Sequence, residues 1–457
     1  MSYSEIISEF LVDLRYNDLS EENVTLAKNL FLDWLTCAYV GSAEEDMKSA
    51  SINYAKSLDL RGKSTLVING YANPIKTIPL LAAFVNGCTS HRLDFDDYHA
   101  GGSVHPGVTV IPATLAVAEA HPSNGKEFIT GMIAGYEICI RVAQFLLPSY
   151  YYFHNTGTAG TFGAAAACGK LLDLDVNQFV NAIGNAGTMA AGLWQFLEDG
   201  ALSKSIHAGN AAKNGLISAE LSKRGMTGAI KIFEGEKGIC RAFNRVDIKD
   251  CNLEILIENL GKKYKIAEVS VKPYPSCAGT HAAIDAIFYL LNDTNIDISL
   301  ISKIEVEVPK RMYDLGLWNK TPKNAYAAKF SIPFCIAAIL KFGKLGVAEF
   351  SDENVKELAD TMNKVDVIHS PELDKEAVEV GSYPSVVKLT LTDGSTLECK
   401  VTYPKGHEKN PMLERDIQKK FEENAKGLIP EDTIRRLISS ISRLERLEDV
   451  SLLFGGE

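Results

Sequence analysis

One glycine-interrupted segment, residues 90–107 with the sequence SHRLDFDDYHAGGSVHPG, concentrates side chains that exchange protons near neutral pH. It holds three carboxylates and three imidazoles: Asp94, Asp96, Asp97, His91, His99 and His105. Histidine changes its charge between pH 5 and 8, and carboxylates act beside it as acids, bases or hydrogen-bond acceptors. The segment is typical of a proton-transfer site or a metal site. A solvated acidic loop before a capped helix would explain it without chemistry.

A second candidate group precedes a glycine-rich helix start in residues 153–163, FHNTGTAGTFG, where His154 is the titratable residue. The glycines are spaced G-x-x-G-x-x-G, whereas the dinucleotide fingerprint requires G-x-G-x-x-G. Close packing of neighbouring helices explains these glycines better than a nucleotide loop does. The start of the helix is still a natural place for an anion such as a carboxylate.

Two cationic side chains are spaced for one helix face in residues 197–209, LEDGALSKSIHAG. Lys204 and His207 are three residues apart, so a helix places the ammonium beside the imidazole. Such a pair binds a dianion or lowers the pKa of each member. A surface lysine next to a capping histidine is the alternative without function.

A third segment, residues 271–281 (VKPYPSCAGTH), is made rigid and extended by two prolines. Lys272 opens it, and Cys277 has no base or oxyanion loop evident beside it, which favours a buried structural cysteine.

The apolar pattern divides the chain into two regions. Up to about residue 264 the segments carry the i, i+3, i+4, i+7 spacing of amphipathic helices, and several are rich in alanine and glycine. Residues 301–311 and 385–403 instead alternate apolar and polar residues, with Asp393–Gly394 marking a hairpin. The sequence therefore predicts a mainly α fold: a large discontinuous all-helical domain (1–264 and 404–457) and a smaller α+β lid domain (265–403).

Bulk composition excludes several classes of protein. The 457 residues are 46% hydrophobic and 23% charged, as in ordinary globular proteins, and the net charge of −11 argues against nucleic acid as a partner. No apolar run reaches the roughly 18 residues that a membrane span needs, and the N-terminus lacks the pattern of a signal peptide. The nine cysteines include no C-x-x-C pair and suggest neither a zinc cage nor a disulfide framework. A cytoplasmic location is expected.

Seven segments in this order resemble the MmgE/PrpD family, which includes 2-methylcitrate dehydratase, cis-aconitate decarboxylase and iminodisuccinate epimerase. The matching stretches are LDFDDYH…HPG, GYEICIRVA, FHNTGTAGTFGAAAA, GLWQFLEDGALSKSIHAG, KPYPSCAGTHAAIDA, AKFSIPFCIAAIL and PKGHEKNP. The resemblance implies the same two-domain fold, a homodimer, and no required metal or organic cofactor.

The resemblance also implies site residues. The family's catalytic positions match Asp94, His105, His154 and Lys204, and its substrate-binding positions match His207 and Lys272. Tyr98 stands where several members have threonine, so we expect it to alter the pocket and the substrate.

The leading functional hypothesis is a cofactor-independent lyase, a 2-methylcitrate dehydratase-like hydro-lyase, that removes a proton next to a carboxylate of a small citrate-like polycarboxylate. His105, His154 or Asp94 would act as the base. A cis-aconitate-type decarboxylase and an iminodisuccinate-type epimerase use the same groups and remain alternatives. A metal-dependent hydrolase with Asp94, Asp96, His99 and His105 as ligands is a further alternative, although Lys204 would be repelled by a bound cation.

Overall fold

The computed structural model describes residues 1–70, 74–294 and 296–455, and the chain divides into two compact units. Unit 1 comprises Met1–Arg92, Asp96–Val269 and Leu413–Glu457, and unit 2 comprises Leu93–Phe95 and Ser270–Met412. These units divide slightly later in the chain than the domain boundaries predicted at 264/265 and 403/404. The assignment of Leu93–Phe95 to unit 2 was not anticipated from the sequence.

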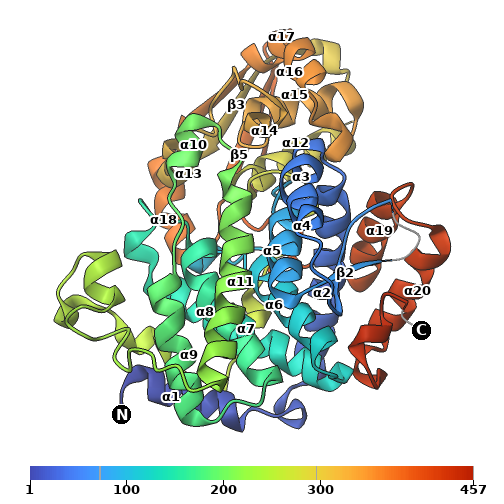
Figure 1. The fold of residues 1–457 in the computed structure, drawn as a ribbon. Helices are drawn as coiled ribbons and strands as arrows, with labels where there is room; N and C mark the ends of the chain where they lie inside the picture. Colours follow the sequence, from blue (N-terminus) through green and yellow to red (C-terminus); the bar gives the residue numbers. More distant parts are fainter. Residues whose placement is uncertain (71–73, 295, 456–457) are drawn as a thin grey trace. The chain divides into compact units, whose positions relative to one another are not determined.

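Unit 1 is built from helices whose apolar faces are buried against one another (Figure 1). At its centre α8 packs against α6, α7 and α11, and α5 packs against α6 and α11. Among the described residues of unit 1, the helices longer than ten residues are α1 (Tyr3–Asp13), α2 (Glu21–Ser42), α5 (Pro79–Ser90), α6 (Gly107–Ala120), α7 (Gly125–Phe145), α8 (Asn155–Leu171), α9 (Val176–Met189), α11 (Ser203–Lys223), α19 (Glu414–Ala425) and α20 (Glu431–Ser442). A short hairpin of β1 (Ser64–Leu66) and β2 (Ile75–Thr77) accompanies them.

The two ends of the chain meet within unit 1. Helices α19 and α20, drawn in red in Figure 1, pack against α2 near the N-terminus, drawn in blue. Lys420 of α19 donates to Asp33 of α2 at 2.6 Å, and both side chains are buried. A paired buried charge of this kind tolerates little displacement, because removal of either partner leaves the other uncompensated.

The glycines of α8 allow the close helix packing that the sequence predicts. A Cβ on Gly163 would lie 2.5 Å from Cys139 Cβ and 2.8 Å from Gly135 O, both on α7. A Cβ on Gly160 would lie 2.6 Å from Thr109 on α6. These contacts are shorter than real Cβ atoms allow, so only glycine fits at both positions.

Unit 2 is an α+β unit around a four-stranded sheet of order β4-β3-β5-β6. Strand β3 (Ile301–Val308) pairs parallel with β4 (Val365–His369) and antiparallel with β5 (Ser385–Leu391), which pairs antiparallel with β6 (Thr396–Val401). The turn between β5 and β6 contains Gly394 at φ 85°, as the predicted Asp-Gly hairpin requires. Helix α12 (His281–Thr294) packs against β5 and β6, and α15 (Ile332–Phe342) packs against α12 and β4. The observed fold is therefore mainly α, with a smaller α+β part, as predicted.

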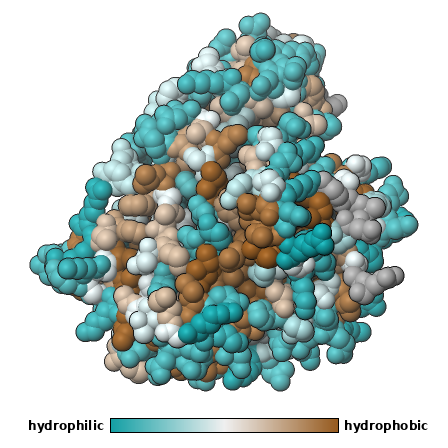
Figure 2. Space-filling view, in the orientation of Figure 1, coloured by the Kyte–Doolittle hydropathy of each residue, from teal (hydrophilic) through white to brown (hydrophobic). Residues whose placement is uncertain are grey.

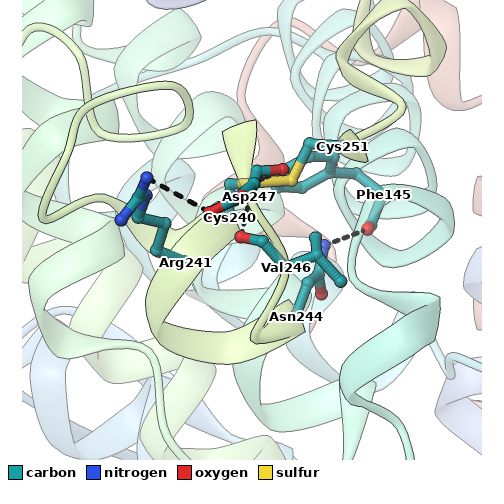
Figure 3. Close-up of a disulfide and its surroundings, with 7 residues drawn as sticks. All are labelled: Phe145, Cys240, Arg241, Asn244, Val246, Asp247 and Cys251. Atoms are coloured by element: carbon teal, nitrogen blue, oxygen red, sulfur yellow. Dashed lines mark hydrogen bonds and ion pairs between the residues drawn. A yellow bond between two sulfur atoms is a disulfide. The ribbon is translucent and has the colours of Figure 1, made fainter. Parts of the chain in front are cut away.

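Figure 3 shows a disulfide between Cys240 and Cys251 in unit 1, which the sequence analysis did not predict. The enclosed segment is fixed by Asn244, whose amide donates to the carbonyl of Phe145 at 2.9 Å, and by an ion pair of Arg241 with Asp247. The spacing of eleven residues matches no standard cysteine motif, so only the fold brings the two side chains together.

The surface of the view in Figure 2 is mixed, with apolar side chains exposed near its centre, where α5 and α11 lie in Figure 1. Leu202, just before α11, and Ile206 and Leu221 on α11 are among the exposed large apolar residues. None of the described helices combines the length and the apolar content that crossing a membrane requires.

Candidate active site

The candidate site is organised around the carboxylate of Asp96, which receives two imidazoles on one oxygen. Asp96 Oδ2 lies 2.9 Å from His91 Nδ1 and 3.0 Å from His105 Nδ1. His91 caps the C-terminus of α5, and His105 lies two residues before the first residue of α6. Because α5 and α6 pack against each other, the loop between them returns His105 to His91.

The acceptors around these rings define which nitrogen carries the proton. His105 Nδ1 lies near two oxygens, that of Asp96 and the backbone carbonyl of Asp97 at 2.9 Å, so it must donate. His91 Nδ1 likewise donates to Asp96. In a neutral imidazole the other nitrogen, Nε2, is then the basic one. Both rings therefore present Nε2 as a proton acceptor, and His91 Nε2 is buried with no hydrogen-bond partner.

Two more imidazoles extend the cluster. His154, which precedes α8, and His207 on α11 face each other with their Nδ1 atoms 3.1 Å apart. His154 stacks on His91 with ring centroids 5.6 Å apart and planes at 11°. The His91 and His105 centroids are 4.9 Å apart. Four imidazoles and one carboxylate thus form a continuous group in unit 1, hereafter the histidine cluster (His91, Asp96, His105, His154 and His207).

Lys204 stands one helical turn before His207 in α11, as the sequence predicted, and its side chain is 3% exposed. Its positive charge contributes to lowering the pKa of His91, His154 and His207. A buried cation beside imidazoles favours their neutral forms and attracts an anionic ligand.

Burial keeps His91, His154 and His207 neutral at physiological pH. It lowers the pKa of His91 to about 4, although the Asp96 carboxylate acts in the opposite direction. Burial, followed by Lys204, lowers the pKa of His207 to about 4. Burial and then the neighbouring imidazoles hold the pKa of His154 well below its ordinary value. For Asp96, burial acts to raise the pKa, but the two histidines outweigh it, and the net pKa is well below the usual range.

Aromatic rings cover the His154–His207 pair. Trp194 lies 4.8 Å from His154 between ring centroids, Phe196 lies 5.5 Å from His207, and the two aromatic rings stack at 5.2 Å. The Trp194 indole donates to the carbonyl of Phe153 at 3.2 Å, which ties this cover to the residue before His154. The aromatic rings exclude water from the sides of the imidazoles that they cover, and so contribute to the burial of His154.

A second buried carboxyl, that of Asp97, fixes the loop between α5 and α6 through hydrogen bonds to its neighbours. Asp97 accepts hydrogen bonds from the Tyr136 hydroxyl at 2.6 Å and from the Gly107 backbone at 3.0 Å. Burial raises the pKa of Asp97 to about 8, against these two hydrogen bonds. Its side chain therefore holds the start of α6 while its carbonyl orients His105.

The structure does not assemble the metal ligands considered from the sequence. His99 uses both ring nitrogens elsewhere, with Nε2 donating to Glu268 at 3.1 Å and Nδ1 accepting from Gly102 at 2.9 Å. Among the described residues, His91, Asp96 and His105 bring one ligand atom each within 4.8 Å of one another. These atoms already hydrogen-bond to each other, and the charge of Lys204 acts on His91. The donor set therefore fits an internal hydrogen-bond network better than a divalent cation.

Asp94 and Lys272 form a buried ion pair in unit 2. Lys272 Nζ donates to Asp94 Oδ1 at 2.7 Å and to the Asp94 carbonyl at 3.0 Å, and Asp94 has a left-handed backbone with φ 54°. The adjoining chain is fixed by Val271, whose backbone donates to Gly406 at 2.9 Å. Cys277, expected to be buried, is partly exposed.

The predicted residues therefore fall into two groups. His105, His154, Lys204 and His207 belong to unit 1, whereas Asp94 and Lys272 pair within unit 2; Tyr98 is buried directly after Asp97. From the sequence, His91 and Asp96 were among the titratable residues of 90–107 but had no role in the predicted lyase site. Trp194 and Phe196, which cover His154 and His207, were not predicted to belong to the site. The sequence signal for the roles of His91 and Asp96 was the density of imidazoles and carboxylates in residues 90–107, and this density does not show which side chains hydrogen-bond to each other.

Comparison with known proteins shows that both parts of the chain match models of one protein family. The model of the MmgE/PrpD N-terminal domain matches residues 5–250, and that of the MmgE/PrpD C-terminal domain matches residues 274–446. Cis-aconitate decarboxylase of Homo sapiens is 26% identical over 99% of this chain and 94% of its own length. Cis-aconitate decarboxylase of Aspergillus terreus is 26% identical over 98% of this chain and 94% of its own length.

Proposed function

The chain belongs to the MmgE/PrpD family, and from this premise we propose that it is a lyase that removes a proton next to a carboxylate of a small citrate-like polycarboxylate. The observation that carries the proposal is the paired hydrogen bonding of Asp96 to Nδ1 of His91 and of His105, which leaves Nε2 of each ring as the nitrogen that can accept a proton. A neutral imidazole held by a carboxylate is a general base that operates at neutral pH.

In the proposed dehydration, His105 Nε2 takes the proton from the carbon next to a carboxylate. The C–H electron pair forms the new carbon–carbon double bond, and the hydroxyl on the adjacent carbon leaves. His154 Nε2–H protonates that hydroxyl, so the leaving group departs as water. Lys204 pairs with a substrate carboxylate and stabilises the negative charge that develops on it during proton removal. No step requires an organic cofactor.

The roles of the remaining predicted residues stay proposals. Asp94, as catalytic residue, and Lys272, as substrate-binding residue, are supported by their buried mutual pairing. Tyr98 is proposed to shape the pocket, since it is a bulky residue directly after the two aspartates. A homodimer is supported by the exposed apolar residues of α11, and equilibrium sedimentation would test it. A cytoplasmic location is proposed because seven of the nine cysteines are free thiols.

Decarboxylation is the second candidate reaction, because the relatives compared above are named cis-aconitate decarboxylases. The carbanion left by loss of carbon dioxide would be protonated by the same imidazoles. Dehydration is placed first because it begins with proton abstraction, for which the hydrogen bond of His105 Nδ1 to Asp96 leaves Nε2 as the accepting nitrogen. Epimerisation, in which a carbanion is reprotonated on its other face, is the third outcome of the test.

The test is a proton NMR time course of chelator-treated protein in deuterated buffer. The panel holds 2-methylcitrate, citrate, cis-aconitate and an iminodisuccinate-type dicarboxylate. An unsaturated product supports the hydro-lyase, a decarboxylated product supports the second candidate, and deuterium gained with inversion supports the epimerase. Activity that requires a divalent cation to be added back would contradict the cofactor-independent mechanism. Absence of turnover and exchange on every member would contradict the proposed substrate class.

A further inference from the structure

The His154–His207 contact is the strongest feature that the proposed mechanism does not use. Two Nδ1 atoms at 3.1 Å form a hydrogen bond only if one carries a proton and the other does not. The rings must therefore adopt opposite tautomers, and one proton lies between them. His207 is only partly buried, whereas His154 is 1% exposed.

We propose that His207 is the solvent-side partner of a two-imidazole proton relay that recharges His154, rather than a substrate-binding residue. This inference rests on the proposed function for the role of His154. In the relay, His154 gives its Nε2 proton to the substrate while its Nδ1 takes the proton of His207 Nδ1. His207 then takes a proton from solvent at Nε2. The starting tautomers return by the reverse sequence: His154 Nε2 takes a proton from solvent that enters on product release, His154 Nδ1 returns its proton to His207 Nδ1, and His207 Nε2 releases its proton to solvent.

The relay explains how a deeply buried imidazole acts as an acid. A cationic His154 would be costly in this environment because burial and three neighbouring imidazoles disfavour its charge. In the relay each ring begins and ends neutral, and only the tautomers exchange. Charge therefore need not accumulate inside the cluster.

Local packing holds the rings of His154 and His207 against each other. The backbone of His154 donates to Gly192 O at 3.1 Å, and a Cβ on Gly192 would lie 3.2 Å from His207 Cγ. A Cβ on Gly157 would lie 3.2 Å from His207 Cβ. Two glycines thus leave the space that His207 occupies, and Phe196 contacts both rings, with centroids at 6.1 Å from His154 and 5.5 Å from His207.

The neighbouring charges also fit a relay. The residue facing His207 from its own helix is Lys204, whose positive charge lowers the imidazole pKa. Across the pair, His154 faces His91, His105 and the Trp194 ring. A second cation beside Lys204 would be unfavourable. A neutral His207 that passes protons is therefore favoured, whereas a charged His207 that binds a carboxylate is disfavoured.

The first experiment compares His207→Asn with wild type in steady-state turnover of the substrate found by NMR. Asparagine keeps a hydrogen-bond donor near the Nδ1 position but cannot pass a proton. We expect kcat to fall about 100-fold, within the usual range for general acid–base catalysis, with KM unchanged and with partial recovery on adding imidazole. A raised KM without imidazole rescue would overturn the relay and support carboxylate binding. His121→Gln, at an exposed histidine bonded to Glu220, is the matched control and should leave kcat unchanged.

The second experiment does not depend on turnover. Nitrogen-15 NMR of labelled histidines reports which ring nitrogen is protonated. The relay predicts an averaged tautomer for His154 in wild type and a single tautomer in His207→Asn, because the amide passes no proton to or from the ring. An identical single tautomer in both proteins would overturn the relay even if the lyase activity is confirmed. An averaged wild-type tautomer in a protein inactive on every carboxylate would support the relay while the proposed function fails.

Discussion

Asp96 Oδ2 accepts the Nδ1 proton of His105 at 3.0 Å, and this single contact fixes the tautomer of the proposed base. The same oxygen accepts from His91 at 2.9 Å. One carboxylate therefore orients two imidazoles in unit 1. A hydrogen bond from one ring nitrogen to a carboxylate commonly fixes the tautomer of a catalytic histidine in this way.

Replacing Asp96 with asparagine tests that relationship. The amide keeps the shape of the side chain but removes the negative charge. If its NH2 group takes the place of Oδ2, it cannot accept the hydrogen bonds from His91 and His105. We expect kcat to fall about 10²–10⁴-fold, the range associated with general acid–base catalysis. Steady-state kinetics measure the loss, and circular dichroism verifies the fold. A variant that is folded and within threefold of wild type would refute the role of Asp96.

Lys204→Met removes the buried ammonium while keeping most of the apolar side chain. We expect loss of most of the activity, because the substrate carboxylate and the developing charge lose their cation. The pKa of His207 should rise, since Lys204 lowers it in wild type. Turnover and histidine NMR titration measure the two effects. Lys213→Met on the same helix, where the amine contacts Asn210 at 3.0 Å, is the control and should retain activity.

The pH dependence of stability should report the buried neutral histidines. The pKa of His91 is about 4 in the folded protein, against 6.5 for an unperturbed imidazole. The unfolded state therefore binds more protons below pH 6.5, and stability falls as the pH drops from about 6.5 towards 4. His91 alone should account for about 2 kcal/mol of the free energy of unfolding between pH 7 and 5.

Urea unfolding of wild type and His91→Asn at pH 7 and pH 5 measures this contribution. The asparagine variant should lose about 2 kcal/mol less than wild type on acidification, whatever its stability at pH 7. Equal losses in the two proteins would mean that His91 is not held neutral by the fold.

How much of this arrangement could be predicted depends on the range of the interactions. The helical and strand regions follow from local periodicity, and the β5–β6 hairpin follows from Asp393–Gly394. Lys204 and His207 share a helix face, so their spacing was sufficient. The Lys272–Asp94 pair spans 178 residues, and no local pattern specifies such a contact. The sharing of Asp96 by two histidines depends on how a glycine-containing loop returns between α5 and α6.

Gly163→Ala tests the close packing of α8 on α7. The added Cβ would meet Cys139 Cβ at 2.5 Å and a backbone oxygen at 2.8 Å, so overpacking should lower the free energy of unfolding by about 1–3 kcal/mol. Gly131→Ala on α7 is the comparison variant: its added Cβ would lie 3.3–3.4 Å from its neighbours, which is close but further than at Gly163, so it should destabilise the protein less. Chemical denaturation measures both. Equal effects would contradict the packing account.

The Cys240–Cys251 disulfide predicts a thiol count. Protein isolated with thiols blocked and then denatured should carry seven alkylated cysteines, rising to nine after reduction, by intact mass. Reduction should lower the free energy of unfolding by about 2–4 kcal/mol, the typical contribution of a disulfide. Nine alkylated cysteines before reduction would contradict the disulfide and would support the proposed cytoplasmic location.

The most direct test of the account is hydrogen exchange at the substrate carbon next to a carboxylate. Wild-type protein, His105→Gln and the His121→Gln control are incubated with a citrate-like polycarboxylate in deuterated buffer, and deuterium incorporation is followed by NMR. We predict that wild type and the control exchange this hydrogen, whereas His105→Gln exchanges it at least about 100-fold more slowly. Exchange by His105→Gln at the wild-type rate would contradict the assignment of the histidine cluster as the proton-abstracting site.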